Sequence, residues 1–185
     1  MTSQRSDFAR NERAIIEAAA RVLSDAPAAG MGEIAAAAEL GRATLYRHFA
    51  TREALIDGLR AEAFDAVDAA IARSDAEPDG ARVEALVADL IEVGERYQIV
   101  FASPPDEHAR TQMQRRFDRP LLALLERAQA EGELAPDVPP TWLLVALEAA
   151  LGGALRARAD GRLGRADAKR FALRALLGGF GAPAA

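Results

Sequence analysis

The sequence predicts an all-α protein, on three observations. Apolar residues recur at helical spacing along the whole chain, and no segment shows the sustained apolar–polar alternation of a strand. Breaks rich in proline and glycine, at 25–30, 74–80 and 132–140, together with shorter turns between them, divide this pattern into about eight or nine helices. Half of the 185 residues are apolar, which is enough to bury a core.

The first fifty residues carry the most informative pattern. A helix is predicted from about Phe8 to Ser24. Its inner face holds Ile15, Ile16, Ala19, Val22 and Leu23. After a proline-containing turn come a short helix of small residues from Glu33 to Ala38, a turn with Gly41, and a second short helix to about Phe49. This order is the sequence form of a helix-turn-helix, whose second helix can lie in a DNA groove.

The second short helix has the side chains and the charge that DNA contact requires. Leu45 and Phe49 are four residues apart, so both can bury on one face while the polar residues between them point outward. From Gly41 to Arg52 there are three arginines, one histidine and no acidic residue. The first 60 residues hold eight arginines and eight acidic residues, so residues 61–185 carry the whole net charge of −5. Because salt screens charges over about 8–10 Å, this local balance matters more than the total.

Further helices are expected through the rest of the chain. Thr51 is a suitable N-cap for a helix over 52–73. The other predicted helices cover 81–101, 106–131, 141–158 and 165–180. We expect the helical region 106–131 to be interrupted at Arg119–Pro120, where Asp118 could cap the restart.

Composition argues against several classes of protein. There is no cysteine, so neither a disulfide framework nor a thiolate metal site can form, and this absence fits a reducing cytoplasm. No signal-peptide pattern opens the sequence, and no apolar run reaches the roughly 18 residues needed to span a bilayer. No metal-ligand set, phosphate-binding glycine loop or nucleophile motif is present. We therefore expect a cytoplasmic protein that is not an enzyme, with no metal, cofactor or membrane contact.

Two stretches of the sequence resemble a known family. R-A-I-I-E-A-A-A-R-V-L, followed by E-I-A-A-A-A-E-L-G-R-A-T-L-Y-R-H-F-A-T-R-E-A-L, is similar to the TetR family of bacterial transcriptional regulators over about residues 10–58. The resemblance implies a homodimer whose two N-terminal domains bind a palindromic operator. It also implies a helix-turn-helix domain over 1–50 and a helical effector-binding and dimerisation domain over 51–185, with 52–73 as the connecting helix.

The resemblance assigns seven residues to DNA contact. They are Arg42, Ala43, Thr44, Tyr46, Arg47, His48 and Arg52. Arg42 and Thr44 would make contacts at the start of the recognition helix, and the small Ala43 would let that helix approach the bases. Tyr46, His48 and Arg52 match phosphate-contacting positions. Arg47 stands at a variable position, so we expect it to read a base, as arginine does when it pairs with guanine.

The turn departs from the family pattern at two positions, and the helix before it at a third. Glu39 replaces the usual turn glycine, which requires the turn to relax or to accept strain, and it adds a negative charge near phosphate. Gly41 replaces the usual Ser or Thr cap, although glycine is itself an acceptable N-cap. Gly30 likewise stands where a capping Thr is common.

The large side chains of the second half have two interpretations. Six residues form this set: Phe64, Tyr97, Phe101, Met113, Phe117 and Trp142. The simpler interpretation is that they pack a core. Since the resemblance implies an effector cavity, and such cavities are mostly apolar, we also expect some of the six to line it.

The last two predicted helices carry stripes of small residues that could pack closely against another helix. The residues proposed for a dimer interface are Ala146, Ala150, Gly153, Ala157, Ala172, Leu176 and Phe180. Two such helices per chain can form a four-helix interface about a two-fold axis, and packing within one chain is the alternative.

Together these features predict a sequence-specific DNA-binding regulator, most simply a repressor that a small-molecule effector releases from its operator. The alternatives are a helical small-molecule-binding protein or enzyme without a DNA role, and an architectural DNA binder without an effector.

Overall fold

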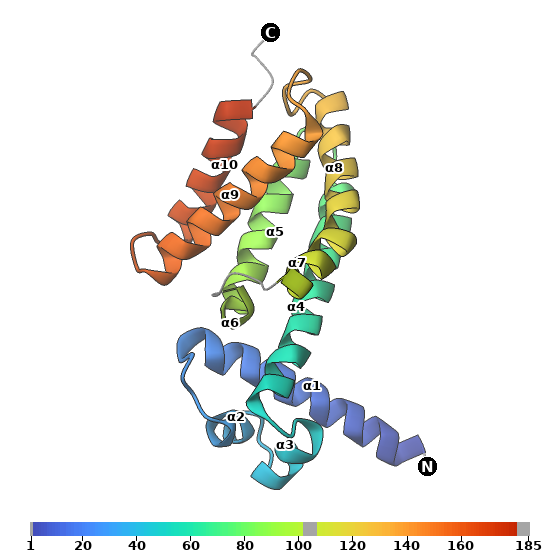
Figure 1. Ribbon diagram of the computed structural model, residues 1–185, viewed down its shortest axis with the longest axis vertical. Helices are drawn as coiled ribbons and strands as arrows, with labels where there is room; N and C mark the ends of the chain where they lie inside the picture. Colours follow the sequence, from blue (N-terminus) through green and yellow to red (C-terminus); the bar gives the residue numbers. More distant parts are fainter. Residues whose placement is uncertain (1, 102–106, 181–185) are drawn as a thin grey trace. The chain divides into compact units, whose positions relative to one another are not determined.

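The computed structural model describes residues 2–101 and 107–180, and the regular structure of these residues is helical, as the sequence predicts (Figure 1). Two compact units can be distinguished. Unit 1 comprises Met1–Asp65 and Glu95–Ser103, and unit 2 comprises Ala66–Gly94 and Pro104–Ala185. The boundary predicted at residue 50 therefore falls inside unit 1, which also includes the first part of the connecting helix.

Unit 1 is built from α1 (Thr2–Asp25), α2 (Met31–Ala37), α3 (Arg42–His48), the first part of α4 (Arg52–Asp75) and α6 (Gln98–Phe101). Helix α2 packs on α1, and α3 packs on α2. The largest fully buried side chains of the unit are Ile15, Leu23, Ile34, Leu45, Leu55 and Leu59. These apolar residues hold the helix-turn-helix together, and the predicted burial of Leu45 and Phe49 is confirmed at 0% and 6% exposed.

Caps define the ends of the short helices. Gly30 and Gly41 are the N-caps of α2 and α3, with extended backbone angles. The Glu33 carboxylate accepts a hydrogen bond from the Gly30 N–H at 2.7 Å, which supplies the partner that a glycine side chain cannot. Thr51 Oγ1 accepts a hydrogen bond from the Ala54 N–H at 3.1 Å, as predicted for the start of α4.

The turn between α2 and α3 places Glu39 in the left-handed region at φ 55°. Its N–H donates to the carbonyl of Ala36 at 3.0 Å, and the N–H of Leu40 donates to that of Ala35 at 2.9 Å. These two bonds form the Schellman motif, which favours glycine at the position Glu39 occupies. The turn therefore keeps the glycine geometry and accepts the strain of a side chain.

Unit 2 contains the rest of α4, most of α5 (Arg82–Arg96), α7 (Glu107–Met113), the π-helical turn η1 (Gln114–Asp118), α8 (Arg119–Ala130), α9 (Pro140–Ala159) and α10 (Arg165–Phe180). Helix α9 packs on α10 and on α8. The core of unit 2 includes Val83, Leu86, Leu124, Leu134, Leu143 and Leu147, all nearly inaccessible to solvent.

Three predicted helix boundaries differ from the structure. The helix expected over 81–101 stops at Arg96, and α6 begins at Gln98. The interruption expected at Arg119–Pro120 is present only as a change from the π-turn η1 to α8, which begins at Arg119 with the proline in its first turn. The chain stays helical there, and Asp118 has helical angles of −59° and −47° with no capping bond from its side chain. The π-turn directly before Pro120 accommodates the proline without a break. Helix α1 begins at Thr2, ahead of the predicted start, which the sequence could not indicate because residues 2–7 carry no apolar periodicity.

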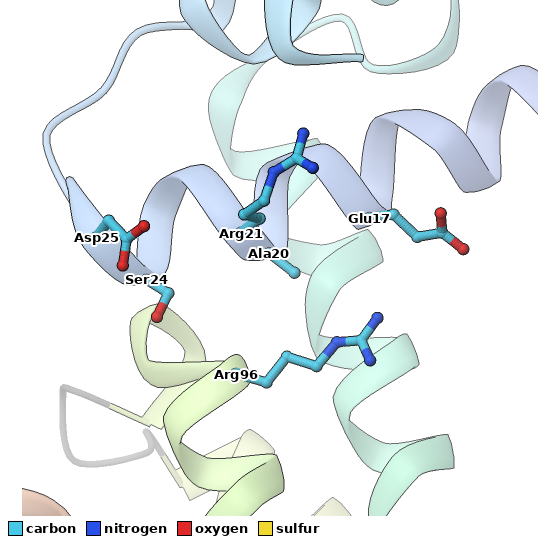
Figure 2. Close-up of a pocket in the computed structure, with 6 residues that line it drawn as sticks. All are labelled: Glu17, Ala20, Arg21, Ser24, Asp25 and Arg96. Carbon is cyan, nitrogen blue, oxygen red and sulfur yellow. The ribbon is translucent and has the colours of Figure 1, made fainter.

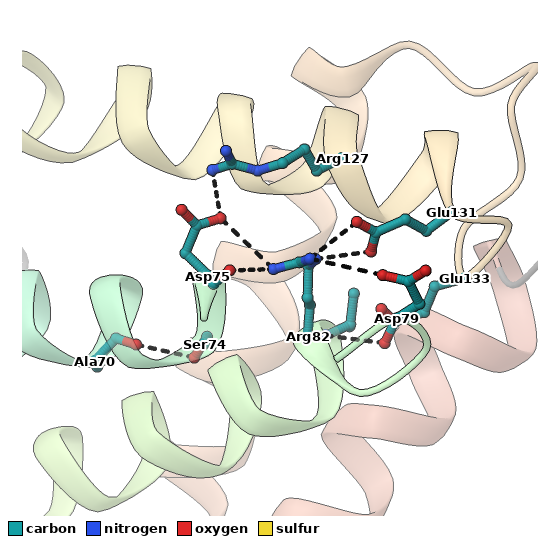
Figure 3. A network of polar contacts seen from close by, with 9 residues as sticks. Ala70, Ser74, Asp75, Asp79, Arg82, Arg127, Glu131 and Glu133 are labelled. Atoms are coloured by element: carbon teal, nitrogen blue, oxygen red, sulfur yellow. Dashed lines mark hydrogen bonds and ion pairs between the residues drawn. The ribbon is translucent and has the colours of Figure 1, made fainter. Parts of the chain in front are cut away.

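A buried arginine organises one end of unit 2 (Figure 3). Arg82 is 8% exposed and donates to both carboxylate oxygens of Glu131, at 2.7 and 2.9 Å. It also bonds to the Asp75 carbonyl and lies 3.8 Å from the Asp75 carboxylate and 3.9 Å from that of Asp79, while Arg127 pairs with Asp75. These contacts tie together the end of α4, the start of α5 and the end of α8.

Two carboxyl groups at this end have their pKa values moved in opposite directions. The hydrogen bond from Arg82 lowers the pKa of Glu131, and the same bond raises the pKa of Arg82. Burial raises the pKa of Glu133, although its carboxylate accepts a hydrogen bond from the Val83 N–H at 2.9 Å. Arg82 and Glu131 are thus each stabilised in the charged form.

Candidate nucleic-acid interface

Helix α3 presents the side chains that the sequence assigns to DNA. Arg42, Ala43, Tyr46 and Arg47 are exposed, and Thr44 and His48 are partly exposed. Tyr46 is 50% exposed although it is a large aromatic residue, while Leu45 beside it is fully buried. The structure therefore brings six of the seven predicted DNA contacts together on one short helix.

Arg42, at the start of α3, folds back over α2. A Cβ atom placed on Gly32 would lie 2.7 Å from Arg42 Nη2 and 2.8 Å from its Nε. Only the absence of a side chain at Gly32 leaves room for the guanidinium there. Gly32 was not singled out from the sequence, because a glycine inside a short helix gives no indication of what packs over it.

Arg52, the seventh predicted contact, is already bonded within unit 1. Its Nη2 donates to the Pro27 carbonyl at 2.6 Å, and its Nη1 donates to the Ala29 carbonyl. The guanidinium therefore holds the loop between α1 and α2. Arg21 has a comparable role, since its Nη2 donates to the Ala37 carbonyl at 3.1 Å. That Arg52 contacts phosphate stays a prediction. Such a contact would use guanidinium N–H groups of Arg52 that do not donate to the Pro27 and Ala29 carbonyls.

His48, the last residue of α3, is covered by an aromatic ring from α1. The ring centroids of Phe8 and His48 are 3.9 Å apart, and their planes are inclined at 32°. Phe8 is nevertheless 50% exposed, so it lies at the surface rather than in the core. Phe8 could not be singled out from the sequence, because it stands at the expected start of a helix.

A groove of about 370 Å³ opens on unit 1, but its lining does not match the predicted apolar cavity (Figure 2). It is lined by Glu17, Ala20, Arg21, Ser24, Asp25 and Arg96. Its four charged side chains are exposed, with two of each sign. An apolar effector would gain little by entering it.

The six large side chains predicted to line an effector cavity are divided between the units. Phe64, Tyr97 and Phe101 belong to unit 1, and Met113, Phe117 and Trp142 belong to unit 2. Phe64, Tyr97 and Phe117 are buried, as the core interpretation predicts, and burial raises the pKa of the Tyr97 hydroxyl. Trp142 is 55% exposed, so the cavity interpretation does not fit it within unit 2.

Unit 2 contains a pair of carboxyl groups that the sequence did not single out. Partial burial raises the pKa of Glu148 on α9, and the nearby negative charge of Asp118 raises it further. Asp118 is the last residue of η1, and π-helical turns are frequent at functional sites. No sequence motif joins these two residues, because thirty positions separate them and only the fold makes them neighbours.

Of the residues proposed for the dimer interface, some are buried within the chain and others are exposed. Ala172 and Leu176 are 3% and 4% exposed and pack within unit 2, so the dimer interpretation is wrong for them in this packing. Ala146, Ala150 and Ala157 are partly exposed, Gly153 is exposed, and the Phe180 side chain lies outside the described residues. The large apolar side chains that are exposed among the described residues of α9 and α10 are instead Trp142, Val145 and Phe171.

The described residues contain no group of three or more His, Asp or Glu side chains that could hold a metal ion. Within the same ranges, no helix has the length and apolar character needed to cross a bilayer.

Comparison with known proteins identifies the family. Residues 15–59 match the sequence model of the bacterial regulatory proteins of the tetR family. The HTH-type transcriptional repressor LfrR of Mycolicibacterium smegmatis is 32% identical over 157 residues, which cover 82% of this chain and 81% of LfrR. The chain belongs to the tetR family. It is therefore a DNA-binding transcriptional regulator with a helix-turn-helix.

Solved structures support the same assignment. The TetR-like regulator LfrR from Mycobacterium smegmatis, crystallised in complex with proflavine, matches with a TM-score of 0.73 and 29% identity, covering 92% of this chain and 96% of LfrR. A putative TetR-family regulator from Rhodococcus sp. matches with a TM-score of 0.66 and 19% identity, covering 90% and 96% of the two chains. The second likeness concerns the fold alone.

Proposed function

We propose that the protein is a homodimeric repressor that binds a palindromic operator and is released from it by a small molecule. The observation that carries the DNA-binding part is α3, a short helix with four exposed residues that include two arginines and no acid. Arg47 reads a base, and Tyr46 and His48 bind backbone phosphates. A helix with an exposed, acid-free polar face is suited to the major groove.

The dimer forms through α9 and α10. Trp142 and Val145 on α9 and Phe171 on α10 are 55%, 50% and 42% exposed, an unusual amount of apolar surface for two neighbouring helices. Nothing lies within 4 Å of a Cβ placed on Gly152 or Gly153, so a second helix can approach the backbone of α9 closely. A second copy of the chain is the natural partner, because two-fold symmetry places two recognition helices about 34–36 Å apart.

The effector is a small organic molecule, and the support for this step is the similarity to LfrR, which was crystallised with proflavine. An effector that binds one arrangement of the dimer better than the other shifts the population away from the DNA-binding arrangement. Binding rather than catalysis is the role proposed, and the site of action is the cytoplasm, where the operators lie.

Selection of bound duplexes from a random pool tests the DNA-binding part. We expect enrichment of an approximate palindrome, and Arg47→Ala should lose about 1–3 kcal/mol of discrimination at one base position in each half-site. Arg115→Ala removes an arginine that is also exposed, but from unit 2, and is the matched control. Enrichment without any sequence preference would instead indicate an architectural DNA binder.

Sedimentation tests the dimer. Val145→Glu places a charge on the proposed interface and should give a monomer with weakened operator binding, whereas Ala123→Glu on the exposed side of α8 should remain dimeric. A wild-type protein that sediments as a monomer at the concentrations that bind DNA would contradict the assembly.

Proflavine is the probe for the effector step. Titrated into the complex with the selected operator, it should release the protein and bind more weakly when the operator is present, because coupling between two sites is reciprocal. Binding of both without mutual effect would refute release by an effector.

A further inference from the structure

The contact between Phe8 and His48 joins α1 to the end of α3 at the surface of unit 1, outside the core. The nearest buried residue along α1 is Ile15, so Phe8 lies two turns away from the core of the unit. Its ring lies 3.9 Å from that of His48, between centroids, yet half of its surface faces solvent. A phenylalanine in that position adds little to the buried apolar area, so its effect on folding should be small.

The His48 ring has one nitrogen shielded and unpaired. Nδ1 is buried and has no hydrogen-bond partner among the described residues. A neutral imidazole carries a hydrogen on one nitrogen and a lone pair on the other. Buried N–H groups without an acceptor are rarer than buried acceptors without a donor, so the shielded Nδ1 is best suited to hold the lone pair. The hydrogen then belongs to Nε2, which is left as the donor of the ring.

We propose that Phe8 is a positioning residue for DNA binding, which holds the His48 imidazole so that Nε2–H donates to a backbone phosphate. This inference rests on the proposed phosphate contact of His48. Without the stacked ring, the imidazole can rotate, and water reaches Nδ1. Both tautomers then become accessible, and one of them has no donor at Nε2. DNA binding would then have to order the ring with its hydrogen on Nε2, and this ordering would weaken the affinity for DNA.

The affinities of four variants for the operator test whether Phe8 acts on DNA binding through His48. The variants are Phe8→Ala, Phe8→Tyr, His48→Ala and the double variant of Phe8→Ala with His48→Ala. Phe8→Ala should weaken operator binding by roughly three- to tenfold, less than the loss of a whole hydrogen bond to a charged group, because the bond can still form once the ring is ordered. Phe8→Tyr keeps the ring and should bind like the wild type. In the His48→Ala background, Phe8→Ala should have no further effect, because its partner is already gone.

Two further measurements separate positioning from a structural role. Alanine is a better helix former than phenylalanine, so the thermal midpoint of Phe8→Ala should stay close to that of the wild type. Nitrogen chemical shifts of the His48 ring, recorded without DNA, should show the Nε2–H tautomer in the wild type and a mixture in Phe8→Ala.

The proposal is overturned if Phe8→Ala binds the operator normally, or if its penalty persists in the His48→Ala background, which would mean that Phe8 itself touches DNA. It is also overturned if the ring shifts of His48 are the same with and without Phe8. If the wild-type protein selects no duplex at all, the proposed function fails, while the nitrogen shifts still report separately on whether Phe8 sets the tautomer.

Discussion

Replacing Glu39 by glycine should stabilise the helix-turn-helix. Glu39 has φ 55° at the Schellman position that follows α2, and a left-handed conformation costs a residue with a side chain about 1–2 kcal/mol. Glycine removes this cost, but it also raises the conformational entropy of the unfolded chain, which lowers the free energy of unfolding by about 0.5–1 kcal/mol. Taking the middle of each range, the net gain for Glu39→Gly is about 0.5–1 kcal/mol.

Glu39→Ala is the matched control, because it removes the same charge and keeps the strain. Its free energy of unfolding should stay near that of the wild type. For a chain of this length 1 kcal/mol moves the midpoint by about 2–4 °C, so the glycine variant should melt about 1–4 °C higher than the alanine variant. Circular dichroism gives the midpoints, and hydrogen exchange should place the added protection in unit 1, where Glu39 lies.

Glu39→Gly and Glu39→Ala should have the same affinity for the operator. Both remove a carboxylate from the turn beside the recognition helix, so both should bind the operator more tightly than the wild type, and by the same factor. Equal thermal midpoints for Glu39→Gly and Glu39→Ala would refute the strain argument. Unequal gains in affinity would show that charge alone does not explain the effect of Glu39 on DNA binding.

Two further predictions concern unit 2. A Cβ on Gly94 would lie 2.8 Å from Leu155 Cδ2 and closer still to Cδ1. Gly94→Ala should therefore lower the free energy of unfolding in urea by about 1–2 kcal/mol. When both proteins also carry Leu155→Ala, the Gly94→Ala substitution should cost much less. Glu131→Gln should lower the thermal midpoint at neutral pH, because Arg82 lowers the pKa of Glu131 in the folded state and so its carboxylate stabilises the fold above its unfolded pKa. That difference should shrink as the pH falls through the lowered pKa of Glu131, and a difference that persists in acid would contradict the ion pair as its cause.

The recognition helix could be predicted from the sequence because its signals are local. Leu45 and Phe49 are separated by one helical turn, Gly41 precedes the helix, and arginines follow without an acid between them. Each of these features lies within about twelve residues, and the structure places them as expected. At Glu39 the resemblance marks a position that usually holds glycine, but it leaves open whether the turn relaxes or accepts strain, and the φ of 55° shows that it accepts strain.

Features that depend on distant contacts could not be predicted. Phe8 and His48 are forty positions apart, and neither residue carries a pattern that points to the other. Arg52 matched a phosphate contact, but its bonds to the carbonyls of Pro27 and Ala29 follow from how a loop folds back. In α10 the periodicity correctly marked Ala172 and Leu176 as packing residues, but periodicity alone cannot say whether the partner helix belongs to the same chain.

The two consecutive glycines of α9 connect the stability of this helix to the amount of protein present. Gly152 and Gly153 each weaken a helix interior by about 1 kcal/mol relative to alanine, and the space above them is open. In the proposed dimer the partner's helix fills that space, so the middle of α9 would be protected from exchange and proteolysis only when the chain is paired. At low concentration the free chain would be most open to proteolysis at this point, so the amount of intact regulator would depend on how much of it is paired.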